Sequence, residues 1–435
     1  MLTNNTKKSV VLGALLATAT AHAQDADLQN QIDALKQQIQ TLQSQTQTNK
    51  DLISNSLGGS QESNVQFHGF MSLGLSQFSE TEIDDIEYYN GQDSSPSVTP
   101  NTWVGLQMNA SLYEGGDLVF QVVSKGTEDF EPETEWLYLK QDLGNGFNAQ
   151  IGRIRFPAFI DSEVVYIGNT YPTIAPPAEI YSVLPMSHLD GISVNHSMDL
   201  GEWALDSKFV LWGESEKGTS GYKLGLKEVH GAVFSFTRDY LTMRIGAFKG
   251  YESINIDYAA DDVVLDDINE SFGDDLTYTT AAIRFDNAQF YFSTEAINIK
   301  SDNDMLDENE NWNATVGYYF GKVMAYVGAS KTHVTNEDEL TAALNEAIPG
   351  TFNYNHPDYG SIPLTAGQLF GGWLVRQQST SVVGIKWDFN PRATFKVQVQ
   401  KVEDFDDTFG NFSSSSRDGA FDHMYIYDIA VQATF

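Results

Sequence analysis

The sequence contains no cysteine, so an exported form of this chain would be held by backbone pairing and packing rather than by disulfides. It also has no apolar run of about 20 residues, which excludes a protein that crosses a membrane with helices. Basic residues are scarce, with 25 Lys and Arg against 59 Asp and Glu and a net charge of -34. Such acidity argues against a nucleic-acid partner, because nucleic acids need basic surfaces.

The first residues are typical of a secretory signal peptide. Lys7 and Lys8 precede the apolar run from Val10 to Ala21, and a small-x-small cleavage site ends at Ala23. We therefore assign residues 1–23 to a signal peptide. The mean hydropathy is -0.30, although the chain has 20 Tyr, 26 Phe and 35 Gly. This combination is more typical of a barrel wall with one lipid-facing side and one water-facing side than of a compact globular core.

From Val65 to Phe435 apolar and polar residues alternate with a period of two, which predicts β-strands. The last stretch, from His423, alternates strictly and ends on Phe435 itself. The predicted strands are 64–79, 101–113, 117–127, 133–143, 147–156, 188–198, 203–213, 227–238, 240–251, 276–286, 288–299, 311–320, 322–334, 378–389, 392–403 and 423–435. The fold predicted is all-β, a 16-stranded antiparallel transmembrane β-barrel over residues 65–435.

The connections between these strands alternate in length. Short ones such as Asn145-Gly146 and Asn390-Pro391 have the Gly, Asn, Asp and Pro residues of tight turns. Long polar segments lie between them, the longest being 335–377. A barrel with short periplasmic turns and long external loops predicts this alternation, whereas a soluble sandwich does not.

Residues 24–48 have the apolar spacing of a short α-helical coiled coil, and the composition of residues 49–64 predicts a flexible linker. The alternative is a solvated Gln-rich linker, because a helix with so few heptads is only marginally stable on its own. Tethering to an oligomeric barrel would raise the effective concentration of the helices and stabilise a trimeric coil. The residues of the seam are Leu28, Ile32, Leu35, Ile39 and Leu42.

The third external connection, residues 156–185, is too apolar for a solvated loop and too aperiodic for a strand pair. Five prolines stiffen it, while Phe159, Tyr166 and Ile174 need a place to be buried. Folding inward against the barrel wall would bury them.

These features resemble a known family, the trimeric porins of Gram-negative outer membranes, whose third loop folds into the channel as an eyelet. The alternating strand that ends at Phe435 resembles the C-terminal signature of outer-membrane barrels. The seam from Leu28 to Leu42 is similar to the periplasmic helices of porins related to the DcaP dicarboxylate channel and of the phosphate-selective class. The resemblance implies a homotrimer in the outer membrane, with its coiled coil in the periplasm, that passes small hydrophilic solutes and is no enzyme.

An inward loop would place three acids, Asp161, Glu163 and Glu179, at the opening. We expect strand Lys and Arg side chains to point into the lumen, because an Arg on the lipid face at the bilayer midplane costs roughly 2 to 4 kcal/mol. An acidic loop that faces a basic wall would produce a transverse electric field across a narrow pore. The predicted basic wall consists of Lys125, Lys140, Arg153, Arg155, Lys208, Arg244, Arg284, Lys386 and Lys396.

Several alternatives stay open at this point. The channel could select small organic anions such as dicarboxylates, although the acids on the inward loop count against this. A barrel enzyme needs a nucleophile beside a histidine, and no nucleophile motif accompanies the scattered histidines. An adhesin with a plugged lumen is favoured if 335–377 folds inside.

The acidic excess lies mainly in external segments, which are predicted to be solvated surface or Ca²⁺ and Mg²⁺ sites that bridge to lipopolysaccharide. No other cofactor is predicted. These segments are 80–87, 257–275, 302–310 and 404–407.

Overall fold

The computed structural model describes residues 64–79, 86–89, 91–184, 186–219, 222–258, 268–302, 304, 306–347, 352–356, 360–365, 376–406, 408, 410–414 and 422–435. The predicted signal peptide, the coiled-coil seam from Leu28 to Leu42 and nearly all of the linker lie outside these residues. Gln66–Phe435 form one compact unit. Among the described residues, none of the helices has the length and apolar character needed to cross a membrane.

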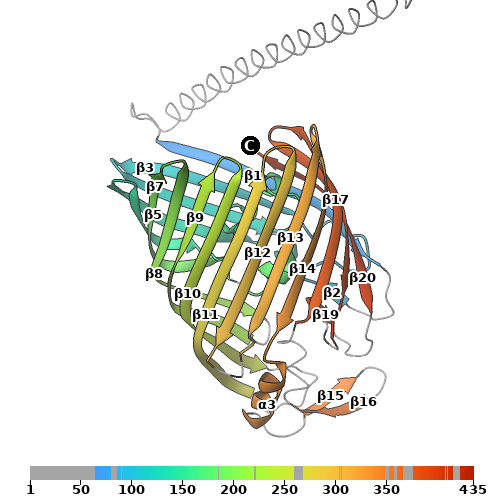
Figure 1. The fold of residues 1–435 in the computed structure, drawn as a ribbon. Coiled ribbons are helices and arrows are strands. Elements are labelled where there is room, and N and C mark those ends of the chain that lie inside the picture. The colour runs from blue at the N-terminus through green and yellow to red at the C-terminus, as the bar shows by residue number, and fades with distance from the viewer. Residues whose placement is uncertain are drawn as a thin grey trace, which may run out of the picture. The chain divides into compact units, whose positions relative to one another are not determined.

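Sixteen antiparallel strands close into a barrel, which confirms the predicted strand number (Figure 1). Strands that follow one another in the barrel are hairpin neighbours, and β1 pairs with β20 from Phe70–Thr434 to Phe78–Ile426 to close the wall. The strands are β1 (Val65–Phe78), β3 (Trp103–Tyr113), β4 (Gly116–Lys125), β5 (Pro132–Gly144), β6 (Phe147–Arg155), β7 (His188–Leu200), β8 (Trp203–Thr219), β9 (Tyr222–Arg238), β10 (Leu241–Tyr258), β11 (Ile268–Asp286), β12 (Phe290–Ser301), β13 (Asn309–Phe320), β14 (Val323–Val334), β17 (Gln378–Asn390), β18 (Ala393–Glu403) and β20 (His423–Thr434).

Two hairpins are longer than the sequence predicts. The β8–β9 pairing continues to Thr219–Tyr222, and the β10–β11 pairing continues to Tyr258–Ile268. The β8 and β11 parts of these extensions are mostly polar and charged, so the alternation of hydropathy is weak on one strand of each pair. Backbone hydrogen bonds do not require that alternation, and the ladders therefore extend further than the pattern does.

The two faces of the wall differ in chemistry. Large apolar side chains such as Ile151, Val327 and Val383 are more than half exposed on the outer face. Buried polar side chains such as Ser72, Gln121 and Gln398 occupy the alternate positions that face inward. This is the pattern of a barrel with lipid outside and a polar lumen inside.

Smaller elements in the external connections were not predicted. β2 (Ile86–Tyr88) pairs with β19 (Phe412–Ser414), and β15 (Phe352–His356) pairs with β16 (Gly360–Leu364). The segment 335–377 also contains the helix α3 (Glu337–Ala347), which buries Leu340 and Leu344. Short paired segments of this kind carry too few residues for a periodic signal.

The connection from β6 to β7, residues 156–187, contains η2 (Ser162–Val164), η3 (Gly168–Thr170) and α2 (Ala178–Tyr181). We call it the inward loop. Its apolar residues Phe156, Phe159 and Ile180 are buried in one cluster with inward side chains of β7 to β12. Burial of these residues is the physical reason that the segment leaves the solvent, as its composition predicts.

Candidate functional site: the inward loop and the lumen wall

The inward loop crosses the lumen and contacts walls that are far apart in the barrel. The Trp103 indole N–H on β3 donates to the Tyr166 carbonyl at 3.0 Å, and the Tyr278 hydroxyl on β11 donates to the Ala158 carbonyl at 3.0 Å. The Gln432 amide on β20 donates to the Ile174 carbonyl at 2.8 Å. β3 and β11 are separated by seven strands in the barrel order, so one short segment connects opposite sides of the wall.

Lys396 holds the middle of the loop. Its ammonium donates to the carbonyls of Tyr171 at 2.9 Å and Thr173 at 2.6 Å, and also to that of Gly168. Its side chain is fully buried. An irregular segment inside a barrel leaves backbone carbonyls without ladder partners, and a cation with three donors can satisfy several of them at once. Beside it on β17, Lys386 donates to the Asn169 carbonyl at 2.8 Å.

Three further basic residues hold the start of the loop. Arg284 on β11 makes a bidentate pair with Asp161, with N···O distances of 2.8 and 2.7 Å. Arg244 on β10 donates to the Pro157 carbonyl at 2.6 Å, and Lys208 on β8 lies 3.2 Å from Glu163. The basic lumen residues therefore act here as attachment points of the loop.

The three predicted acids have different surroundings. Glu179 does not face an opening: it is buried and accepts hydrogen bonds from Ser330 at 2.7 Å, from Gln378 and from Thr380. Asp161 is also buried, within its pair with Arg284. Only the Glu163 side chain remains open, with 61% of its surface exposed. The prediction that all three border the opening is therefore wrong, because the loop packs its acids against the wall.

Two acids on the wall, Glu135 and Glu295, were not predicted from the sequence. Glu295 on β12 accepts the Ile160 N–H at 2.8 Å, at the entrance of the loop. Glu135 is the extra residue of a β-bulge in β5, where the pairing with β4 shifts between Gln121 and Val122. A bulge turns an additional side chain to one face, and simple alternation cannot predict this.

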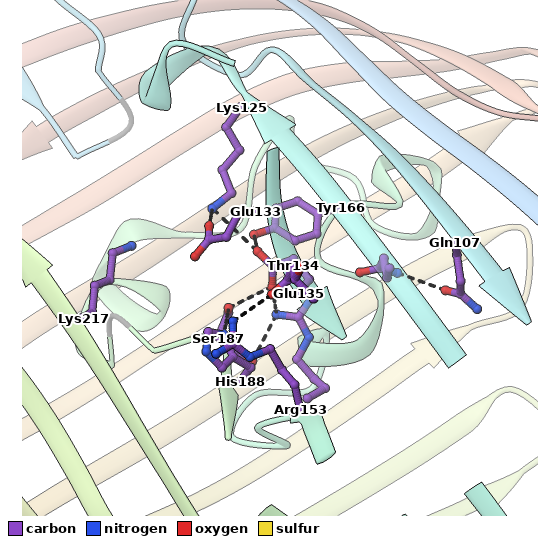
Figure 2. A network of polar contacts seen from close by, with 12 residues as sticks. Gln107, Lys125, Glu133, Thr134, Glu135, Arg153, Tyr166, Ser187, His188 and Lys217 are labelled. Carbon is purple, nitrogen blue, oxygen red and sulfur yellow. Dashed lines mark hydrogen bonds and ion pairs between the residues drawn. The ribbon is translucent and has the colours of Figure 1, made fainter. Parts of the chain in front are cut away.

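Glu135 is the centre of a polar network beside the loop (Figure 2). It accepts hydrogen bonds from the Tyr166 hydroxyl at 2.6 Å and the Ser187 hydroxyl at 2.8 Å, and its oxygens lie 3.2 Å from Arg155 and 3.6 Å from Lys125. Burial and the adjacent Glu135 carboxylate raise the pKa of Tyr166 well above its usual value. The phenol therefore stays protonated and remains a hydrogen-bond donor.

A cavity of about 290 Å³ lies between this network, the inward loop and the wall from β3 to β8. Acids, bases and aromatic rings are mixed along its surface. Lys125 is shared among three carboxylates, with Glu133 at 2.9 Å and Glu128 at 3.2 Å in addition to Glu135. The lining includes Trp103, Lys125, Glu133, Arg155, Tyr166 and Lys217.

One of the remaining predicted basic residues departs from the predicted pore wall. Arg155 is 5% exposed within the Glu135 network and lines the cavity on the lumen side. Arg153 shares its face with Ile151, which is 55% exposed on the outer wall, and pairs there with Asp190. Its lumen assignment is wrong, because an Asp on the next strand neutralises it outside. Lys140 lies two residues after the inward Tyr138 on β5, so it shares the lumen face, and it is half-buried.

The Glu163–Lys208 pair predicts a pH dependence of loop attachment. The neighbouring Lys208 ammonium lowers the pKa of Glu163. Because the pKa of Glu163 is lowered in the folded state, the pair stabilises the attached loop fully at pH values above the usual carboxyl pKa. This stabilisation is lost as the pH falls through the lowered pKa. We expect proteolytic cleavage of the inward loop to increase at acidic pH in this window. A Glu163→Gln variant should show the faster cleavage already at neutral pH; equal pH profiles for both forms would contradict the assignment.

Among the residues that the structure describes, no group of three or more His, Asp or Glu side chains is arranged to hold a metal ion. Much of the acidic external sequence lies outside these residues, so divalent-cation binding there stays a prediction.

Comparison with solved structures supports the assignment of a transmembrane β-barrel fold. No protein-family model and no curated protein sequence matches this chain. Among solved structures, outer-membrane expressed OmpT of Vibrio cholerae is 10% identical, with a TM-score of 0.52 over 87% of this chain and 99% of that one. The trimer form of the same protein gives a TM-score of 0.51 at 10% identity over 85% and 99% of the two chains.

The outer membrane channel DcaP of Acinetobacter baumannii is 10% identical, with a TM-score of 0.48 over 85% of this chain and 97% of that one. The OmpT structures show the fold that this chain shares, and the exposed apolar outer wall is that of a barrel whose outer face contacts lipid. Sixteen antiparallel strands closed into one barrel are therefore the fold that this chain shares with OmpT.

Proposed function

We propose that this protein is an outer-membrane channel through which small hydrophilic solutes diffuse, and that the inward loop sets the size and charge of its constriction. The observation that carries the proposal is a polar-lined barrel crossed by one loop that basic wall residues hold in place. A structural or adhesive barrel does not need charged wall residues that position a lumen loop.

We infer further that the channel is a homotrimer, with residues 24–48 as a periplasmic coiled coil. Its support is the apolar seam in the sequence and the trimer form of OmpT with the same fold. Three barrels side by side would bring three such segments close enough to pair, although each alone would be marginal.

Charges near the cavity argue for weak selectivity. The cations Lys125 and Lys217 are accompanied by the acids Glu128 and Glu133 on the same surface. Carboxylates between the lysines reduce the attraction for an anionic solute, so we propose a general channel rather than one for dicarboxylates.

The proposed channel is not an enzyme. Among the described residues, one serine and histidine pair lies close together: the Ser187 hydroxyl is 3.4 Å from His188 Nδ1. In a catalytic triad the carboxylate orients the histidine. Here the Ser187 hydroxyl donates its hydrogen bond to Glu135 at 2.8 Å, so the carboxylate contacts the serine and not the histidine.

Planar-bilayer recording of the purified protein under a salt gradient tests the proposal. We expect three equal closing steps and a small reversal potential, because the trimer has three pores with mixed charge. Strong anion selectivity with block by dicarboxylates would favour the organic-anion alternative. Absence of conductance from correctly folded protein would contradict the channel.

A further inference from the structure

The cavity beside the Glu135 network contains polar groups that the surrounding protein leaves without partners. Ser215 on β8 and Arg155 on β6 both line this cavity and are 7% and 5% exposed. Among the residues that the structure describes, the Ser215 hydroxyl and the Arg155 Nε have no hydrogen-bond partner. Buried polar groups in proteins are nearly always hydrogen-bonded, because an unpaired one costs free energy. A bound solute with hydrogen-bond acceptors would satisfy both groups.

Two β-bulges aim side chains at this cavity. In β8 the register with β7 shifts after Val210, which makes Leu211 an extra residue. Val210 is buried before this bulge, whereas Ser215 is buried after it, so the odd-numbered positions of β8 turn inward from there. Ser215 and Lys217 therefore both line the cavity, and Glu135 occupies a second bulge in β5. Bulges that re-aim side chains in this way are over-represented next to functional sites.

Opposite charges alternate along one side of the cavity. Lys125 lies 2.9 Å from Glu133 and 3.2 Å from Glu128 (Figure 2). The Lys217 ammonium lies 4.0 Å from the Glu128 carboxylate, and 46% of the Lys217 side chain is exposed. An ammonium has three donors and a carboxylate accepts about four hydrogen bonds, so these contacts leave hydrogen-bonding capacity on Lys217 and on both acids. This side of the cavity therefore offers places for one negative and one positive group of the same solute.

The loop side of the same cavity is apolar. Its lining there includes Val165, Pro176, Leu184 and Met186 of the inward loop. A solute with an apolar part gains free energy on this side, because the transfer of apolar surface out of water is favourable. The cavity volume of about 290 Å³ is near the lower end of the range for small-molecule sites, which limits the occupant to one small molecule.

We propose that this cavity is a binding site for a small zwitterion with an apolar side chain, which is the chemistry of an apolar α-amino acid. The solute carboxylate accepts hydrogen bonds from Ser215 and Lys217, which share one face of β8, and its ammonium donates to Glu128 or Glu133. The proposal rests on the channel function proposed above and names the class of solute that the channel holds. A zwitterion has no net charge, so its binding is consistent with weak ion selectivity.

The mixed charge of the cavity decides against solutes with charges of one sign. A dicarboxylate would place a second negative group beside Glu128 and Glu133, and a diamine would place a second positive group beside Lys125 and Lys217. Like charges at close range repel, and this repulsion selects against such solutes. A neutral sugar meets no repulsion, but it leaves the cavity's charges without oppositely charged partners.

Ligand-observed NMR titration of the purified channel in detergent tests the assignment with L-leucine as the probe. N-acetyl-L-leucine keeps only the negative charge and L-leucinamide keeps only the positive charge. We expect L-leucine to bind roughly tenfold more tightly than either analogue, because each analogue loses one charge-assisted contact. Absence of leucine binding, equal affinity for one of the analogues, or tighter binding of succinate or glucose would overturn the proposal.

Ser215→Ala separates a binding role from a structural one. We expect leucine affinity to fall roughly tenfold, since the hydroxyl contact to the carboxylate is lost. The free energy of unfolding should not fall, because the Ser215 hydroxyl has no protein partner to lose. The control is Ser293→Ala on β12, an equally buried serine at 6% exposure that is not part of the cavity lining. Unchanged leucine affinity in Ser215→Ala, or an equal loss in Ser293→Ala, would contradict the site.

Lys217→Met tests which end of the solute binds where. Leucine affinity should fall, whereas leucinamide affinity should not, because leucinamide has no carboxylate for Lys217 to bind. Lys300→Met on β12 is the matched control, since the Lys300 side chain is 51% exposed and is not part of the cavity lining. An equal loss of affinity for leucine and leucinamide in Lys217→Met would overturn the assigned orientation and with it the proposal.

Bilayer recording of the same wild-type preparation separates this proposal from the channel function. Conductance in protein that does not bind leucine would overturn the site and leave the channel. Leucine binding by protein that does not conduct would overturn the channel and leave the site.

Discussion

Replacement of Lys396 by methionine is expected to detach the middle of the inward loop and to increase single-channel conductance. Three loop carbonyls lose their donor, and each buried unpaired carbonyl costs about 1–3 kcal/mol. Methionine fills much of the same volume but donates no hydrogen bond. The carbonyls can regain partners only by moving toward water, which means that the loop leaves the wall. Bilayer recording measures the conductance, and denaturant unfolding in detergent measures the loss of stability.

Lys140→Met is the matched control for this experiment. Lys140 also faces inward, on β5, but the loop contacts described above do not involve it. Both variants remove one positive charge from the lumen. If conductance and unfolding change equally in the two, then charge removal and not loop attachment would explain the result, and the role assigned to Lys396 would be wrong.

Breaking the Asp161–Arg284 pair is expected to have an effect of similar size. Arg284→Met leaves Asp161 as a buried carboxylate without its bidentate partner, which typically costs about 3–5 kcal/mol. We expect a lower unfolding free energy, together with frequent fluctuations of the open-channel current as the start of the loop moves. Removing both partners in Asp161→Asn with Arg284→Met should cost less than Arg284→Met alone, because no uncompensated charge is left.

The control here is an exposed pair, Arg238 with Glu202, at 2.5 Å in a short turn region. Arg238→Met should change stability by only about 0–1 kcal/mol, as is usual for solvent-exposed ion pairs. Comparable losses for Arg284→Met and Arg238→Met would show that burial adds nothing to the Asp161–Arg284 pair. An additive double variant would equally contradict the coupling.

Much of the fold follows from the sequence because alternation and turn chemistry are local properties. Ile151 and its neighbours on β6 show the apolar parity of an outer wall, and Asn145-Gly146 before them marks a tight turn. All sixteen strands were found in this way. The pairs β2–β19 and β15–β16 were missed because three to five residues do not establish a period.

The site was less predictable, and Arg153 and Glu135 show why. Arg153 has the same parity as the outer residue Ile151, yet the cost of a charge in lipid predicts a lumen position. In the structure it stays on the outer face and pairs with Asp190 from the next strand. Glu135 was missed because a bulge breaks the alternation at that residue. The positions of Arg153 and Glu135 both depend on contacts between neighbouring strands, and the sequence of a single strand does not reveal these contacts.

By itself the sequence determined the strand number, the alternation of faces and the inward position of one apolar loop. Each follows from local hydropathy and from the need to bury Phe159 and its neighbours. Only the tertiary structure decided how the charges are used. It buries Glu179 and Lys396 as attachments of the loop and leaves Glu163 open. The reason is physical: whether a charge faces water depends on the partners that the closed barrel brings to it from distant strands.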